Sequence, residues 1–276
     1  MGITASQVKE LREKTGAGMM DCKKALVESG GDEEKAVMYL REKGLSKAAK
    51  KAGRATSEGL VTPYISEDGK TAVISELLCE TDFVAKGEDF QAFAAALSEK
   101  IAGLDMTNGA ATDLPAEVAD VTDLIAKLGE NMGVGRFAKV STDGVLGIYV
   151  HTNKKLASIV ELTGGGDEAL AKDIAMHVAA MNPTCITSDE LPQDVLEKEK
   201  ALYLKQAMDE GKPENIAEKI VTGRLNKFYS EVCLVNQAFI KEDKKSVKDV
   251  LGGATVASIA RLALGEGAKK DAEAED

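Results

Sequence analysis

The residues best suited to specific chemistry are a carboxylate and an aromatic ring, Asp82 and Phe83, within the run Glu80–Lys86 (ETDFVAK). A rigid ring can fill a pocket of a partner protein, and a neighbouring charge can compete there with an anionic ligand. Aromatic residues are scarce, at 4% of the chain with no Trp, which makes Phe83 conspicuous. The alternative is that Phe83 packs beneath its own helix, although Phe90 and Phe93 already supply aromatic bulk to that face. The run predicts a binding site.

An internal repeat surrounds this run, and only its first copy carries it. Residues 64–77 align without a gap on residues 149–162, with Tyr, Lys, Ala, Ile, Glu and Leu at identical offsets. The second copy continues instead with a turn of three glycines, Gly164–Gly166. The run Glu80–Lys86 follows one copy of the repeat and is missing from the other. This indicates that the run serves a partner rather than the fold.

Patterns that carry catalysis or nucleotide binding are missing from the sequence. There is no P-loop and no Gly-x-Ser-x-Gly elbow. Of the two histidines, His177 falls among apolar positions of a predicted helix and is interpreted as a packed residue, whereas His151 is equally a surface contact or a turn residue. The four cysteines are widely spaced, in no zinc or disulfide motif. We expect a protein that is not an enzyme, with no catalytic residue, cofactor or metal; a hydrolase using His151 is the remote alternative.

The net charge of -11 argues against direct binding of nucleic acid, because phosphate contact needs a basic face. One segment, residues 41–54, is basic, with six Lys and Arg residues against the single acid Glu42. It is interpreted as a solvated helix joining two domains, or as a contact for an acidic partner. No apolar run approaches the ~18 residues of a membrane span. We expect a cytoplasmic protein without a membrane partner, although residues 1–6 fit the minimal myristoylation pattern.

Hydrophobic spacing predicts an α+β protein. Three short helices are expected first, with a capping box at Thr4 and Gln7, the third helix ending at Gly44. The middle segments are strands near 59–65 and 71–79 joined as a hairpin, an amphipathic helix through Phe90 and Ile101, a loop at 108–115, a helix from Val118 to Leu128, and strands near 134–140 and 145–151. The later segments are a helix from Leu170 to Met181, charged helices at about 193–210 and 214–229 forming an antiparallel helical hairpin, a returning strand at 233–240, a mixed segment at 246–264 and an acidic end.

Two long segments, Leu11–Leu26 and Glu76–Lys86, resemble the two signature stretches of the elongation factor Ts family. The resemblance continues through the segment around His177 and the helical hairpin. It implies an N-terminal three-helix module like that of ubiquitin-associated (UBA) domains and a core of two related α+β subdomains with an inserted coiled-coil hairpin. The implied boundaries are 1–54 for the UBA-like module with its basic linker, 55–140 for core subdomain N, 141–181 and 230–264 for core subdomain C, 182–229 for the inserted hairpin, and 265–276 for an acidic tail.

The resemblance also implies a function. Members of this family exchange guanine nucleotide on the GTPase elongation factor Tu, with the equivalents of Asp82 and Phe83 inserted beside its Mg²⁺ and phosphate site. The implied partner-binding residues are Thr81, Asp82, Phe83, Val84, Lys23, Leu128, Gly129 and His151. The sequence departs from the family after Phe239, where a charged run replaces a hydrophobic pair. A scaffold that binds ubiquitin-like proteins through the first module is the competing interpretation, and the hairpin could also pair with itself.

Overall fold

The computed structural model describes residues 3–266, whose secondary structure mixes helices and strands, as expected for an α+β protein. These residues divide into two compact units. The first holds residues 3–64, 73–139 and 262–266, and the second holds Ile65–Ala72 and Val140–Arg261. The finer five-part division stays a prediction. Residues 1–2 of the acylation pattern and 267–276 of the acidic tail lie outside the described residues. Within that described range, no helix combines the length and apolar character needed to cross a membrane.

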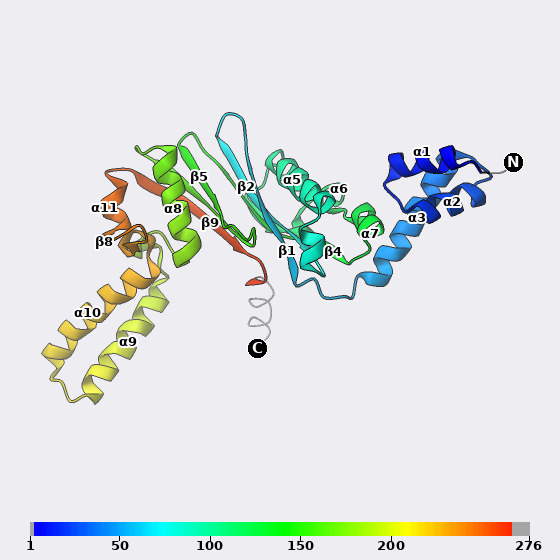
Figure 1. The fold of residues 1–276 in the computed structure, drawn as a ribbon. Coiled ribbons are helices and arrows are strands. Elements are labelled where there is room, and N and C mark those ends of the chain that lie inside the picture. The colour runs from blue at the N-terminus through cyan, green and yellow to red at the C-terminus, as the bar shows by residue number, and fades with distance from the viewer. Residues whose placement is uncertain (1–2, 267–276) are drawn as a thin grey trace. The chain divides into compact units, whose positions relative to one another are not determined.

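The first unit begins with three helices that enclose a small core. They are α1 (Ala5–Thr15), α2 (Met19–Glu28) and α3 (Glu33–Lys51) (Figure 1). The predicted capping box is confirmed, because Gln7 N–H donates to Thr4 Oγ1 over 3.3 Å and Thr4 N–H donates to Gln7 Oε1 over 2.9 Å. The buried core residues are Val8, Leu11, Cys22, Ala25, Leu26 and Ala36. The likeness of these helices to UBA domains stays a prediction.

The prediction that the third helix ends at Gly44 is wrong. Helix α3 continues to Lys51, and Gly44 is buried within it. A Cβ atom at Gly44 would lie 3.3 Å from Cβ of Ala126, on α7 (Thr122–Leu128). The glycine therefore lets two helices approach closely. This tertiary packing outweighs the low helix propensity of glycine, which is about 1 kcal/mol less favourable than that of alanine.

Three lysines of α3 are bound to oxygen atoms of the same unit. Lys43 and Lys47 both donate to Asp21, with Nζ–Oδ distances of 2.6 and 2.8 Å. Hydrogen bonds from these two ammonium groups hold the pKa of Asp21 below its ordinary value. Lys51 donates to the carbonyl oxygen of Gly129. These contacts favour the interpretation of the basic segment as a connecting helix over that of a contact for an acidic partner.

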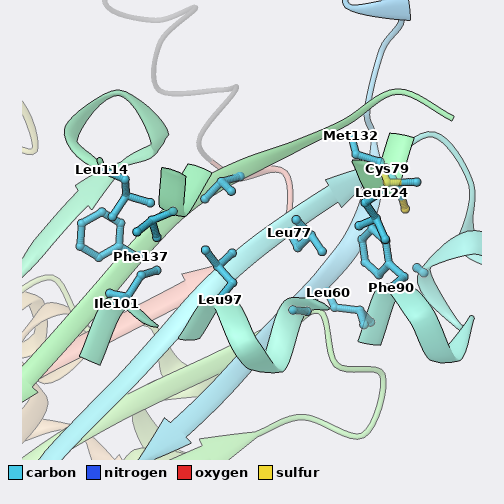
Figure 2. Packing of buried hydrophobic residues seen from close by; sticks show 14 of the residues in the cluster. Leu60, Leu77, Cys79, Phe90, Leu97, Ile101, Leu114, Leu124, Met132 and Phe137 are labelled. Carbon is cyan, nitrogen blue, oxygen red and sulfur yellow. The ribbon is translucent and has the colours of Figure 1, made fainter. Parts of the chain in front are cut away.

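A four-stranded sheet carries the main core of the first unit. Its order is β1 (Glu58–Ile65), β2 (Thr71–Cys79), β4 (Met132–Ser141) and β3 (Asn108–Ala110). The predicted hairpin is confirmed, since the first two strands are neighbours in this sheet. Helix α5 (Glu88–Ala102) buries its apolar face in the cluster of Figure 2, whose members include Leu77, Phe90, Leu97, Ile101 and Phe137.

Two local predictions for residues 108–128 are wrong. The expected loop contains strand β3, which pairs antiparallel with β4, and a 3-10 turn, η1 (Ala111–Asp113). The single helix expected up to Leu128 is two helices, α6 (Ala116–Ala119) and α7. Asp120 separates them, because its carboxylate accepts from Thr122 N–H over 2.9 Å. Such a local bond from side chain to backbone competes with the hydrogen bonds of a continuous helix.

The second unit is built on a three-stranded sheet of order β5 (Val145–Val150), β6 (Leu156–Thr163) and β9 (Thr255–Ala263). The first two strands pair antiparallel. Helix α8 (Glu168–Met181) packs on both of them (Figure 1). It comes so close at Gly147 that a Cβ atom there would lie 2.1 Å from the carbonyl carbon of Ala171. Only glycine permits this approach.

Helices α9 (Gln193–Asp209) and α10 (Glu214–Val232) follow a short 3-10 turn, η2 (Ser188–Glu190), and pack side by side (Figure 1). Arg224 of α10 donates to the Gln206 side chain over 2.7 Å and to Glu210 over 3.1 Å, both on or beside the end of α9. These bonds fix the connection between the two helices. The coiled-coil character expected for the pair stays a prediction.

The returning strand expected at residues 233–240 is wrong. Backbone N–H groups of Asn236 and Gln237 donate to the carbonyl oxygen of Cys233, so the chain forms a 3-10 turn, η3 (Leu234–Asn236). Strand β7 (Ala238–Phe239) is correspondingly short. The elements after it are β8 (Glu242–Ser246), which pairs with β7, and α11 (Val247–Leu251).

Candidate functional site

The run that follows β2 forms a single helical turn, α4 (Asp82–Ala85). Thr81 caps this turn, because its Oγ1 accepts from Val84 N–H over 3.4 Å. Ala85 is buried and anchors the turn, whereas the residue Phe83 is 83% exposed. The alternative in which Phe83 packs beneath its own helix is therefore wrong. We call residues 81–84 the tip.

A carboxylate on the neighbouring turn holds the first residue of the tip. Glu130 accepts from Thr81 N–H over 3.0 Å and from Thr81 Oγ1–H over 2.6 Å. The same hydroxyl thus donates to Glu130 and accepts from Val84. One oxygen atom links the carboxylate to the capped helical turn, which fixes the rotamer of the threonine.

A second carboxylate makes the reverse connection. Glu80, directly before the tip, accepts from Asn131 N–H over 2.6 Å, and Arg54 lies 3.4 Å from the same carboxylate. The bond from Asn131 is the main cause that keeps the pKa of Glu80 below its ordinary value. The Asn131 side chain in turn donates to the carbonyl oxygen of Arg54 over 2.7 Å. The two segments are therefore bonded reciprocally. Glu130 accepts from the backbone of Thr81, and Glu80 accepts from the backbone of Asn131.

The charge of the tip also has a local partner. Lys86 Nζ lies 2.6 Å from Asp82 Oδ2, and the Asp82 side chain is about half exposed. The hydrogen bond to this carboxylate raises the pKa of Lys86 above its ordinary value. Exposed ion pairs of this kind contribute little to stability, about 0–1 kcal/mol, so a partner can break the pair at low cost.

The other predicted site residues lie in three places. Leu128 and Gly129 end α7, where Gly129 adopts a φ of +83° and turns the chain directly into Glu130. Since Glu130 binds Thr81, the structure brings Leu128 and Gly129 close to the tip. Lys23 lies on the exposed face of α2. His151 belongs to the second unit, exposed at the turn between β5 and β6.

Sequence reasoning missed the carboxylates that position the tip. Glu80 and Glu130 are fifty residues apart, and no local pattern pairs them. The signal that was available is a glutamate at the end of each of two segments, one before Thr81 and one after the glycine cap of α7. Finding the pair requires knowing that β2 and β4 are neighbours in the sheet.

His177, which was weighed as a catalytic base, makes structural contacts instead. His177 is buried, with Nε2 2.9 Å from Gln237 Oε1 and Nδ1 accepting from Ile240 N–H over 3.3 Å. Its interpretation as a packed residue is confirmed, and burial lowers its pKa. In the part of the chain that the structure describes, no group of His, Cys, Asp and Glu side chains is arranged to hold a metal ion.

Comparison with known proteins identifies the family of this chain. A family model described as "Elongation factor TS" matches residues 80–266, more than half of the chain. Similar proteins named "Elongation factor Ts" occur in Nitratidesulfovibrio vulgaris (49% identical, over all of both chains), Desulfovibrio desulfuricans (51%, over 90% of this chain and 91% of that one) and Clostridium botulinum (47%, over 97% and 95%). The chain therefore belongs to the elongation factor Ts family.

Proposed function

We propose that this protein is a non-catalytic guanine-nucleotide exchange factor of the cytoplasm, which binds elongation factor Tu and promotes release of GDP and Mg²⁺ so that GTP can bind. The observation that carries the proposal is the exposure of Phe83, at 83%, on a capped and anchored helical turn. Large rings left in water on a rigid support are typical of binding anchors. The chain's family membership supports the same role in protein synthesis.

The exchange requires differential binding and no covalent chemistry. A factor shifts an equilibrium only by the difference between its affinities for the two states of its partner. It must therefore bind the nucleotide-free GTPase more tightly than the loaded one, and by linkage GDP or GTP must weaken its own binding to the same degree. A shift of about 10⁴ corresponds to roughly 5.5 kcal/mol, which one or two buried anchors can supply.

In this proposal Phe83 is the anchor and Asp82 is the electrostatic component. The ring fills a pocket that is open only in the empty state of the GTPase. The Asp82 carboxylate, released from Lys86, opposes phosphate and competes for the polar groups that hold Mg²⁺. Thr81 and Val84 complete the contact as the cap and the flank of the turn.

Further contacts extend the interface. Lys23 shares one face of α2 with Met20 and Val27, at helical spacing, and both apolar side chains are more than half exposed. We assign this face to the GTPase domain, together with Leu128 and Gly129, and His151 to another domain of the partner. The first three helices act as a UBA-like module within the five-part division given above. The helical hairpin is a coiled coil available for self-association.

The test is release of a fluorescent GDP from elongation factor Tu in excess unlabelled GDP, with and without the purified full chain. Acceleration that grows and then saturates with the concentration of the chain is expected. Excess GDP should also dissociate the complex of the two proteins, as linkage demands. A release rate that stays the same at every concentration of the chain overturns the proposal.

A second function, scaffolding through the first module, is favoured by the exposed apolar side chains Met20, Val27 and Met38 on the first three helices. It is distinguished by comparing the full chain with a chain that lacks residues 1–54. Capture of a ubiquitin-like protein by the full chain alone, without effect on GDP release, supports the scaffold. Loss of exchange in the shortened chain, with no capture of a ubiquitin-like protein by either chain, supports the first proposal.

A further inference from the structure

The helical turn that carries the tip needs support from outside itself. Helix α4 has four residues, too few to be stable by itself, since isolated helices shorter than about 12 residues are marginal in water. Its burial comes mainly from Ala85, because Phe83 is exposed and Val84 is only partly buried. Beside the Lys86–Asp82 pair, hydrogen bonds at the start of the turn therefore help to set the orientation of the ring. Those bonds converge on Thr81.

From this geometry we infer that Glu130 is a positioning residue for exchange, which holds the tip in its binding conformation by accepting both the N–H and the hydroxyl of Thr81. This inference rests on the proposed function. The two bonds, at 3.0 and 2.6 Å, use both carboxylate oxygens and leave the Thr81 hydroxyl oxygen directed at Val84 N–H. Bonds to a charged acceptor are about twice as strong as neutral ones.

The support of Glu130 itself is rigid. It follows Gly129, whose positive φ ends α7, and it precedes Asn131, which is buried and bonded to Glu80 and Arg54. The backbone that carries Glu130 is therefore held independently of the tip, so movement of Thr81 away from it breaks the two bonds. Loss of Glu130 should convert one conformation of the turn into several, of which only a fraction can bind. The apparent affinity falls by that fraction, whereas the complex once formed is unchanged.

The experiment measures GDP release from elongation factor Tu against the concentration of each full-chain variant. For Glu130→Ala we expect the half-saturating concentration to rise about tenfold, the scale of one lost charge-assisted bond, with the maximal rate within about twofold of wild type. Glu130→Gln keeps one of the two acceptors and loses the charge, so its half-saturating concentration should fall between those of wild type and Glu130→Ala. Glu99→Ala, an exposed glutamate of α5, is the matched control and should match wild type.

Two measurements separate positioning from a general loss of stability. In a double-mutant cycle, Glu130→Ala should add less than about twofold to the defect of Phe83→Ala, because it acts through that ring. Since the chain has no Trp, Phe83→Trp provides a single tryptophan that can be excited apart from the tyrosines, and its anisotropy should fall when Glu130→Ala is added. If Glu130→Ala does not fold, Thr81→Val removes the hydroxyl bond from the other side and should show the same rise.

The outcomes are distinct. Equal half-saturating concentrations for Glu130→Ala and Glu99→Ala, with active wild-type protein, overturn the positioning role. Additive defects in the cycle, or unchanged anisotropy, do the same. If the wild-type chain itself fails to release GDP, the proposed function is wrong rather than the role of Glu130.

Discussion

The sulfur atoms of Cys185 and Cys233 lie 3.4 Å apart, although the two residues are separated by both helices α9 and α10. Backbone bonds hold them there: Leu234 N–H donates to the carbonyl oxygen of Cys185 over 2.9 Å, and Thr184 N–H donates to that of Val232 over 2.9 Å. Both thiols are buried and reduced in the structure. The pair lies where the segment before α9 meets the end of α10.

This arrangement predicts that mild hydrogen peroxide forms a disulfide between the two cysteines. Each bond formed takes two thiols and one peroxide and yields two waters. Burial raises the pKa of Cys185 and raises that of Cys233 to about 12, so the thiolate is scarce at neutral pH and the reaction should accelerate as pH rises. Intact mass should show loss of two hydrogens and no added oxygen. Cys185→Ser should abolish this product, and a bond to Cys22 or Cys79 would contradict the prediction.

An ion pair with a buried carboxylate predicts a large effect on stability. Glu76 lies in β2 with its side chain 5% exposed, and it accepts from Arg136 N–H over 2.9 Å and from Arg136 Nε–H over 3.1 Å. Glu76→Leu removes the carboxylate from the guanidinium, which costs about 2 kcal/mol, less than for a fully buried pair because the Arg136 side chain is 27% exposed. Urea unfolding at pH 7.5 should show this decrease in the free energy of unfolding. The exposed control, Glu99→Leu, should change it by less than about 0.5 kcal/mol, and an equal decrease for the two variants would contradict the argument.

His177 predicts a pH dependence of stability. Its folded-state pKa is lowered by burial, so the unfolded chain binds a proton more readily. The stabilisation is therefore complete above the unfolded value of about 6.5 and is lost as pH falls below it, by as much as about 1.4 kcal/mol per pH unit. The urea midpoint should fall between pH 7.5 and 5.5, and less steeply in His177→Gln. His151→Ala, which alters the exposed histidine, should keep the wild-type slope. Parallel slopes for wild type and His177→Gln would remove this residue from the explanation.

Local features of this chain were predictable from sequence, because each depends on neighbours along the chain. The capping box at Thr4 and Gln7 and the hairpin before Cys79 are of this kind. The role of Gly44 is not predictable in this way, because it depends on a contact across the fold with Ala126. Periodicity carries information about one helix and none about the helix packed against it.

The candidate site divides in the same way. The chemistry of Asp82 and Phe83 can be predicted from the sequence, since a charge and a ring directly after a strand can be identified without knowing any tertiary contact. The contact that supports them cannot be predicted in this way, because Glu130 comes near Thr81 only when β2 and β4 pair. The closeness of Cys185 and Cys233 is not predictable from the sequence for the same reason, because contacts far apart along the chain bring the two thiols together.

The measurement that tests the central claim most directly is GDP release from elongation factor Tu by Phe83→Ala. An exposed ring can be removed without disturbing the core, so circular dichroism and the urea midpoint should match wild type. The acceleration should fall by one to two orders of magnitude, taking about 2 kcal/mol for the anchor. Ile65→Ala, which removes another exposed apolar side chain, should retain full activity. An unchanged release rate with Phe83→Ala would contradict the account.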